Sequence, residues 1–175
     1  MRKLRLYIAS SLNSKIAKPD GSVDWLESIP NPEKTDHGYS VFYESIDTSI
    51  MGYRTYQQII DWGIPFPYPD KVNYVITHKR IKNTKQIKFI KENHLDFIQH
   101  LMKQSGKDIW LIGGGQINTL LLNAGLIDEI RLFMMPIVIE DGINFFELIP
   151  NQKYLELLET KEYSTGAVEL KYKIK

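Results

Sequence analysis

The sequence predicts an α/β fold with a mostly parallel sheet. Three observations predict it: short apolar runs end in glycine or polar residues, segments of helical spacing follow several of these runs, and two alternating segments close the chain. The 175 residues are enough for one domain with a sizeable core. No internal repeat or domain boundary interrupts them, so we expect a single domain over residues 1–175.

The first part of the chain predicts a strand, a long loop and a helix. Residues 4–10 are apolar enough for a strand inside a sheet. Residues 11–35 predict a loop broken by several prolines, and loops of this length in a compact domain are often functional. Asp36 stands where a helix N-cap would be. The residues with helical spacing after it are Tyr39, Phe42, Tyr43 and Ile46.

The middle of the chain alternates between strands and helices. Residues 48–52 predict a second strand and residues 53–62 a second helix. Residues 63–70 must form a loop, because their alternating prolines cannot donate to a ladder. A well-defined strand over 71–77 and a weaker one over 87–90 follow.

The last third of the chain predicts a further helix and an antiparallel edge. Residues 95–102 have helical spacing of leucine, isoleucine and methionine. Residues 130–139 form a long apolar strand, interrupted at Pro136. Residues 154–162 and 167–174 predict a hairpin around a Ser-Thr-Gly turn. Alternating strands and helices followed by this hairpin indicate a parallel sheet with an antiparallel edge.

The most informative segment runs from Asp108 to Ile117. An apolar strand ends in Gly113, Gly114 and Gly115, and the next residues have helical character. Such a junction exposes backbone N–H groups at a helix N-terminus, where they can bind a phosphate, and glycines let the backbone approach closely. It is neither G-x-G-x-x-G nor a P-loop. The alternative is that the three glycines form a tight, close-packed turn that binds no phosphate.

Composition excludes several classes of function. The formal net charge of +1 argues against a nucleic-acid partner, because a basic patch or stripe is the usual footprint. The absence of cysteine excludes disulfides, thiolate metal sites and cysteine nucleophiles, and the four histidines are too scattered to predict a metal site. No apolar segment is long enough to span a bilayer, and the N-terminus has no secretion signal. We therefore expect a cytoplasmic protein with no membrane partner.

Four segments, in order, resemble the dihydrofolate reductase-like superfamily, including its riboflavin-biosynthesis branch, the C-terminal reductase domain of the bifunctional deaminase-reductase. They are residues 8–17, 50–56, 75–78 and 112–117. The resemblance covers most of the chain up to Phe146. It implies a three-layer α/β/α fold with a mostly parallel eight-stranded sheet and an antiparallel C-terminal hairpin. It also implies that NADPH binds across the strand ends, where ligands of open α/β sheets bind.

The resemblance also implies a set of cofactor-binding residues. Ala9, Ile16 and Ala17 correspond to the nicotinamide edge, and Gly52, Arg54 and Thr55 to a pyrophosphate and ribose cradle. Thr77, His78 and Lys79 correspond to the adenosine-phosphate side. Gly113, Gly114, Gly115, Gln116 and Ile117 would cover the other face of the pyrophosphate. In this family a cis peptide typically joins the first two glycines, here Gly113 and Gly114.

The sequence departs from the family pattern at three places. Tyr53 stands where the family often has a basic residue, so that Lys79 or Arg80 would have to contact a 2′-phosphate. The riboflavin branch usually has an acidic residue at the position of Ile112. In this respect the chain resembles folate reductases instead. Asn13-Ser14 replaces a common Asp-Gly pair in the first loop.

Reduction of a C=N or C=O group needs a proton as well as a hydride, and Asp36 is the candidate catalytic acid. It precedes the second strand at about the spacing of the folate-reductase pocket acid, where a carboxyl group could bind the N–H edge of a substrate. The alternative, which we favour, is a plain N-cap. Trp25 and Tyr39 could line a substrate slot for a flat heterocycle, or they could only pack in the core.

Two functions remain open from the sequence. The first is an NADPH-dependent oxidoreductase that reduces a small planar heterocycle, either a dihydrofolate-like pterin or a 5-amino-6-ribosylamino-uracil-type pyrimidine. The second is a non-catalytic dinucleotide-binding module or sensor. The chain has no cysteine for the zinc deaminase domain of the bifunctional riboflavin enzyme. The apolar strand at 132–135 and the terminal hairpin could pair with a second copy to form a homodimer, although sheet core explains the strand equally well.

Overall fold

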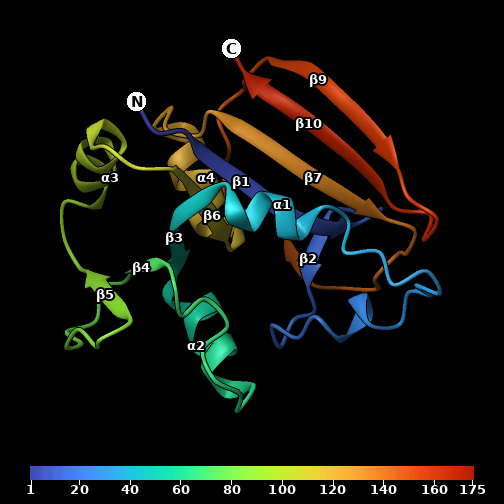
Figure 1. Ribbon diagram of the computed structural model, residues 1–175, viewed down its shortest axis with the longest axis horizontal. Coiled ribbons are helices and arrows are strands. Elements are labelled where there is room, and N and C mark those ends of the chain that lie inside the picture. Colours follow the sequence, from blue (N-terminus) through green and yellow to red (C-terminus); the bar gives the residue numbers. More distant parts are fainter.

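The alternation of apolar strands and amphipathic helices produces one large twisted sheet with helices on both faces. The computed structural model describes residues 1–175 (Figure 1). The strand order in the sheet is β5-β4-β3-β6-β1-β7-β10-β9. The strands from β5 to β7 in this order run parallel, and β10 runs antiparallel to both β7 and β9. The predicted three-layer fold with an antiparallel C-terminal edge is therefore confirmed.

The elements have the following bounds. The strands are β1 (Leu4–Ser11), β2 (Lys15–Ala17), β3 (Ile46–Gly52), β4 (Val72–Ile76), β5 (Ile87–Ile90), β6 (Asp108–Gly113), β7 (Glu129–Met135), β8 (Ile143–Asn144), β9 (Leu155–Glu162) and β10 (Val168–Ile174). The helices are α1 (Tyr39–Glu44), α2 (Tyr53–Asp61), α3 (His94–Lys103) and α4 (Gly115–Asn123), with a short 3-10 helix at Asp24–Leu26.

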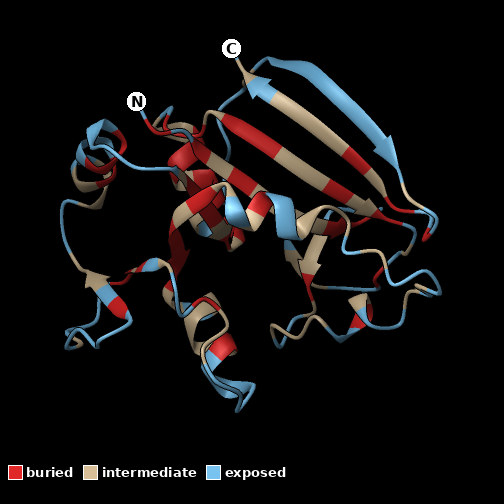
Figure 2. Ribbon diagram, in the orientation of Figure 1, coloured by how far each residue is buried: buried red, intermediate tan, exposed pale blue.

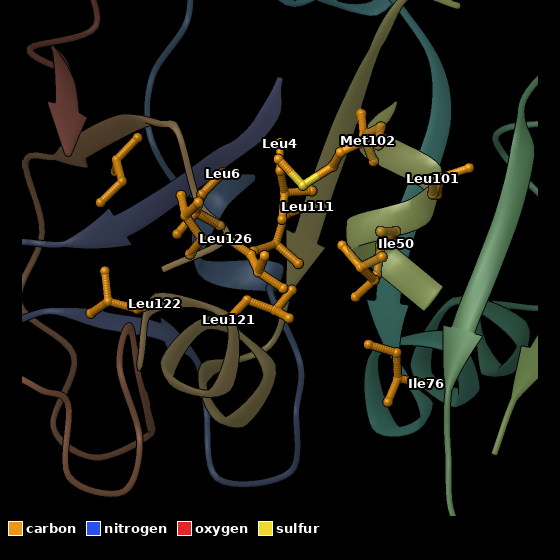
Figure 3. Packing of buried hydrophobic residues seen from close by; sticks show 14 residues of the cluster. Leu4, Leu6, Ile50, Ile76, Leu101, Met102, Leu111, Leu121, Leu122 and Leu126 are labelled. Carbon is orange, nitrogen blue, oxygen red and sulfur yellow. The ribbon is translucent and has the colours of Figure 1, made fainter. Parts of the chain in front are cut away.

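One face of the sheet carries the aliphatic core. Leucine and isoleucine side chains from β1, β3 and β6 pack there against the apolar sides of α3 and α4 (Figure 3). Leu4, Leu6, Leu111 and Leu121 are completely buried in this cluster. Because side chains alternate along each strand, the intervening residues of the same strands project to the opposite face.

The opposite face carries an aromatic core beneath α1 and α2. Phe42 of α1 and Ile59 of α2 pack with Met51, Val75 and Trp110 from the sheet. A smaller cluster continues this face toward the C-terminal hairpin and includes Trp25 of the first loop. This face is the one on which the predicted substrate residues lie.

The long first loop is more structured than the sequence predicts. Residues 11–35 include β2 and the 3-10 helix, and β2 pairs with β8 in a separate two-stranded sheet. Ser11 stabilises the loop, because its Oγ accepts a hydrogen bond from the backbone N–H of Lys15 at 2.9 Å. Pairing with a segment more than 120 residues away explains why local pattern did not predict β2.

The long strand predicted over residues 130–139 is shorter in the structure. Its ladder ends at Met135, immediately before Pro136, because proline has no N–H to donate. The chain turns there, and the backbone N–H of Ile137 donates to the carbonyl of Met135 at 2.8 Å. Residues 137–139 then run beside the first loop, where the backbone N–H of Leu12 donates to the carbonyl of Ile137.

Strand β9 is the outermost strand, and every one of its residues is exposed (Figure 2). Leu155, Leu157 and Leu158 are 41%, 52% and 47% exposed, respectively, which is unusual for leucine in a sheet. None of the helices has the length and apolar character that a bilayer crossing requires.

The core assignment predicts a large effect of truncating a single leucine. Leu121 is completely buried between α4 and the sheet, so Leu121→Ala leaves a cavity and should lower the free energy of unfolding by about 2–5 kcal/mol. Urea denaturation followed by circular dichroism measures this change. Val41→Ala, at a side chain that is 73% exposed on α1, is the control and should shift stability by no more than about 0.5 kcal/mol. Equal effects of the two substitutions would contradict the assignment.

Candidate functional site

Two strand-to-helix junctions lie next to each other at the carboxyl edge of the sheet. Strand β3 passes into α2 at Gly52, and β6 passes into α4 through Gly113, Gly114 and Gly115. The two strands are parallel neighbours, with Met51 opposite Gly113. Both helices therefore begin at the same edge, with their N-terminal N–H groups close together.

The junctions touch because glycines leave no side chains between them. A methyl group at Gly52 would stand 2.8 Å from Cγ1 of Ile117. A methyl group at Gly114 would stand 3.4 Å from Oγ1 of Thr55 and 3.9 Å from Cδ1 of Ile16. The peptide bond between Gly113 and Gly114 is cis, as the resemblance implied. The structure thus brings Gly52, Thr55, Gly114, Ile117 and Ile16 together where the two junctions meet. We call this meeting place the glycine groove.

Gly115 has a different environment from Gly114. A side chain at Gly115 would collide with the carbonyl oxygen of Asn144 and stand 2.7 Å from Cγ of Glu147. Its own carbonyl accepts a hydrogen bond from the backbone N–H of Glu147 at 3.3 Å. Gly115 therefore lets the segment after β8 pack against α4. The next residue, Gln116, is exposed.

The predicted nicotinamide edge is built from β1 and β2. Ala9 lies on β1 near its carboxyl end and packs with the Trp25 cluster, on the aromatic face of the sheet. Ile16 and Ala17 lie on β2, and Ile16 is the residue that approaches Gly114. Apolar side chains thus flank the glycine groove on the side of β1.

The predicted adenosine side lies beyond the end of β4. Thr77 is buried, and its Oγ1 accepts a hydrogen bond from the backbone N–H of Lys79 at 3.0 Å. The Nζ atom of Lys79 lies 4.1 Å from the ring centroid of Tyr53, the first residue of α2. The ring of His78 lies 6.2 Å from that of His94, at the start of α3. Lys79 therefore places a positive charge at the β3–α2 junction, where Tyr53 replaces the basic residue that the family often has.

Two arginines near these strand ends have no carboxylate partner. Of the five arginines in the chain, Arg2, Arg5 and Arg131 each form an ion pair. Arg54, at the start of α2, and Arg80, after β4, form none. Because β3 and β4 are neighbours, this edge of the sheet is locally positive and suits an anionic ligand.

The carboxylate of Asp36 is engaged with the start of α1. Its Oδ1 accepts a hydrogen bond from the backbone N–H of Gly38 at 2.8 Å, and its Oδ2 accepts one from the backbone N–H of Ser40 at 3.0 Å. The hydroxyl of Ser40 also donates to Oδ2, and these bonds, the Ser40 hydroxyl first, lower the pKa of Asp36 to about 2. The side chain is exposed and ionised at neutral pH, and its hydrogen bonds stabilise the start of α1. The N-cap residue of α1 is Gly38, so the prediction of Asp36 as the N-cap is wrong by two residues.

Trp25 and Tyr39 lie on the same face of the sheet as Asp36. Trp25 is 3% exposed and packs against Phe133 and Ala167, yet its indole Nε1 has no hydrogen-bond partner. Tyr39 is half-buried with its ring 6.0 Å from that of Trp110, and burial raises the pKa of Tyr39 to about 12. Tyr39 and Trp25 belong to different hydrophobic clusters, and Tyr7 packs against both clusters.

Sequence reasoning missed a polar network next to these residues. Arg131 of β7 donates through Nε to Oε1 of Glu169, on β10, at 2.6 Å, and the hydroxyl of Tyr163 contacts Oε2 of the same carboxylate at 2.8 Å. The hydroxyl of Tyr163 also lies 3.0 Å from the carbonyl oxygen of His37, to which it can donate. His37 also bonds through Nε2 to the hydroxyl of Thr165 at 2.9 Å.

A signal for this network was present in the sequence. Arg131 interrupts the apolar run from Ile130 to Met135 in β7, whereas Glu169 alternates with Lys171 and Lys173 along β10 and gives no such signal. A charge at such a position must be paired, because an unpaired buried charge is very costly. The partner could not be identified from the sequence, since β7 and β10 meet only through the folded sheet.

Comparison with known proteins agrees with this architecture. Residues 69–168 match the family described as RibD C-terminal domain. The uncharacterized protein YwjB of Bacillus subtilis (strain 168) is 37% identical over 172 residues, covering 98% of this chain and 97% of YwjB.

Two solved structures have the same fold. A putative riboflavin biosynthesis protein from Shewanella sp. PV-4 superimposes with a TM-score of 0.88 at 25% identity, covering 99% of each chain. Dihydrofolate reductase from Enterococcus faecalis, complexed with NADP(H) and RAB-propyl, superimposes with a TM-score of 0.72 at 15% identity. That match covers 99% of this chain and 96% of the reductase, and at this identity it shows the fold alone.

The hydrogen bonds of Asp36 predict a specific pH dependence. A carboxyl group whose pKa falls on folding, here from 3.8 to about 2, stabilises the protein above the unfolded value and loses this contribution as the pH falls through the folded value. The urea midpoint of Asp36→Ala should therefore lie below that of the wild type at pH 6, and the gap should close between pH 4 and pH 2. Glu140→Ala, at an exposed side chain, is the control. A gap that stays constant down to pH 2 would contradict the assignment.

Proposed function

Because this chain belongs to the RibD C-terminal domain family, we propose that it is an NADPH-dependent reductase of a small planar heterocycle. The observation that carries the proposal is the contact between the two glycine-containing junctions. Main-chain N–H groups of two helix N-termini lie close together there, and Gly114 places no side chain beside Thr55. This is the arrangement that a dinucleotide diphosphate requires.

The residues present fit such a cofactor along the whole groove. Gly52, Thr55 and Gly114 would hold the pyrophosphate, with Arg54 as a charge-assisted donor. Lys79 and the unpaired Arg80 would face the adenosine phosphate, and the apolar side chains of Ala9 and Ile16 would face the nicotinamide ring. When bound, NADPH supplies the hydride.

The substrate would bind on the aromatic face, beside β1. Trp25 and Tyr39 would flank a flat ring, and Asp36, ionised at neutral pH, would accept a hydrogen bond from an N–H group of that ring. The proton that accompanies the hydride would then come from water, because Asp36 has none to give at this pH. Pterins and aminouracils both present an N–H edge of this kind.

The proposal is tested directly by cofactor titration and turnover. NADPH should bind with a change in its fluorescence, and absorbance at 340 nm should fall when dihydrofolate or 5-amino-6-ribosylamino-uracil is added. Turnover of one compound and not the other identifies the substrate class. NADPH binding without turnover on either compound would instead favour the dinucleotide-binding module, and no NADPH binding would refute both functions.

Gly114→Val separates cofactor binding from folding. The backbone at Gly114 is extended and its nearest side-chain atom is 3.4 Å away, so a valine can be accommodated but fills the groove beside Thr55. We expect NADPH affinity to fall at least about 100-fold, an effect of about 3 kcal/mol, while the circular dichroism spectrum stays unchanged.

Thr160→Val, on the exposed strand β9, is the control for this experiment and should bind NADPH as the wild type does. Gly115 is unsuitable as a test position, because a side chain there collides with the segment after β8. Retention of wild-type NADPH affinity by a folded Gly114→Val protein would overturn the assignment of the groove.

A further inference from the structure

The ring of Tyr7 is the fixed centre of the aromatic face. It stacks on Phe42 with a centroid distance of 4.1 Å and an interplanar angle of 19°. The ring of Phe133 lies 4.8 Å away, and those of Trp110 and Tyr39 each lie 6.2 Å away. Contacts on several sides hold the phenol in one orientation.

The guanidinium of Arg131 lies beside the same ring, 5.3 Å from the centroid of Tyr7. Glu169 holds this guanidinium in turn, and the backbone of Tyr7 is fixed by the indole N–H of Trp110, which donates to its carbonyl at 3.2 Å. The polar network under the aromatic face therefore keeps the Tyr7 side chain in place.

The hydroxyl of Tyr7 has no partner within the protein. On this side of the sheet the hydroxyl of Tyr163 bonds to Glu169 at 2.8 Å and that of Tyr53 to Gln57 at 3.0 Å, whereas the hydroxyls of Tyr39, Tyr56 and Tyr68 make no hydrogen bond. The Tyr7 hydroxyl makes no such bond, and it is not among the enclosed polar atoms that lack a partner, so solvent reaches it. A largely buried tyrosine normally uses its hydroxyl, and this one is available to a ligand.

The position of this hydroxyl coincides with the proposed substrate slot. Tyr7 precedes Ala9 by two residues on β1, so both side chains lie on the same face of the sheet. Its ring contacts Tyr39 directly and the Trp25 cluster through Phe133. The charges of Arg131, Glu169 and Asp36 all act on its phenol.

The phenol of Tyr7 is a donor at every physiological pH. Burial raises its pKa above the ordinary value of 10, and Arg131 only partly opposes this shift. A protonated phenol donates one hydrogen bond, and a neutral carbonyl oxygen can accept it among the aromatic rings without adding a buried charge. Pterins and aminouracils both carry such an acceptor, the carbonyl oxygen of a lactam.

We infer that the Tyr7 hydroxyl binds the substrate by donating a hydrogen bond to the lactam carbonyl of the heterocycle. This inference rests on the proposed reductase function and adds the group that selects the substrate. It divides recognition between two side chains: Asp36 accepts from the N–H edge of the ring, and Tyr7 donates to the adjacent carbonyl oxygen. A heterocycle with an amino group in place of that carbonyl would bind less well, because its N–H donor would face the O–H donor of Tyr7.

Tyr7→Phe tests this inference, since phenylalanine keeps the stack on Phe42 and removes only the hydroxyl. With whichever of dihydrofolate and 5-amino-6-ribosylamino-uracil the wild type reduces, kcat/KM should fall about 10-fold, the effect of one lost hydrogen bond. The Kd for NADPH should not change. Tyr74→Phe, on the opposite face of the sheet beside Phe97, is the matched control and should behave as the wild type.

A binding measurement makes the test independent of turnover. Fluorescence titration of the NADPH-loaded protein with 2-amino-4-oxopteridine and with 2,4-diaminopteridine should show about 10-fold tighter binding of the oxo compound to the wild type. Tyr7→Phe should lose this preference.

The outcomes separate the inference from the function on which it rests. A wild type that reduces neither heterocycle and shows no preference between the pteridines overturns the proposed substrate class together with the role of Tyr7. A wild type that is active while Tyr7→Phe keeps its kcat/KM overturns only the role of Tyr7. Loss of NADPH affinity in Tyr7→Phe also overturns it, because the hydroxyl would then act through the fold.

Discussion

The close approach of β3 and β6 at their carboxyl ends is the constraint on which the rest of this structure depends. The two helices that follow these strands can begin side by side because Gly52 leaves no Cβ atom between them. A side chain at Gly52 would push α4 away from the sheet through Ile117. The glycine groove is thus a product of backbone packing, and an anion bound in it would meet mainly main-chain N–H groups.

The two faces of the sheet serve different purposes. Aliphatic side chains fill the face under α3 and α4, where packing alone supplies stability. The other face includes the Arg131–Glu169 ion pair among aromatic rings, although burying charges is costly and apolar residues could fill the same volume. That cost is consistent with a face that binds a polar, flat ligand. The fold is that of reductases related to dihydrofolate reductase.

The sequence predicted most elements because their signals are local. The junction at Gly113–Gly115 and the hairpin around Gly166 depend on residues adjacent in the chain. The pairing of β2 with β8 and the partner of Arg131 could not be predicted, because they join segments that meet only in the folded sheet. For the candidate site, the sequence predicted that the two glycine-containing junctions form one site. It gave no signal for Tyr7, because the aromatic residues that surround its ring come from distant segments of the chain.

The central place of β1 has a consequence for biosynthesis. Its two neighbours in the sheet, β6 and β7, begin at Asp108 and Glu129, so β1 leaves the ribosome well before either of its partners has been made. The apolar residues of β1 stay unpaired until then. Unpaired apolar strands make nascent chains prone to aggregation and to chaperone binding. Truncated chains that stop before β6 can therefore assemble only the β3-β4-β5 portion of the sheet and lack the groove altogether.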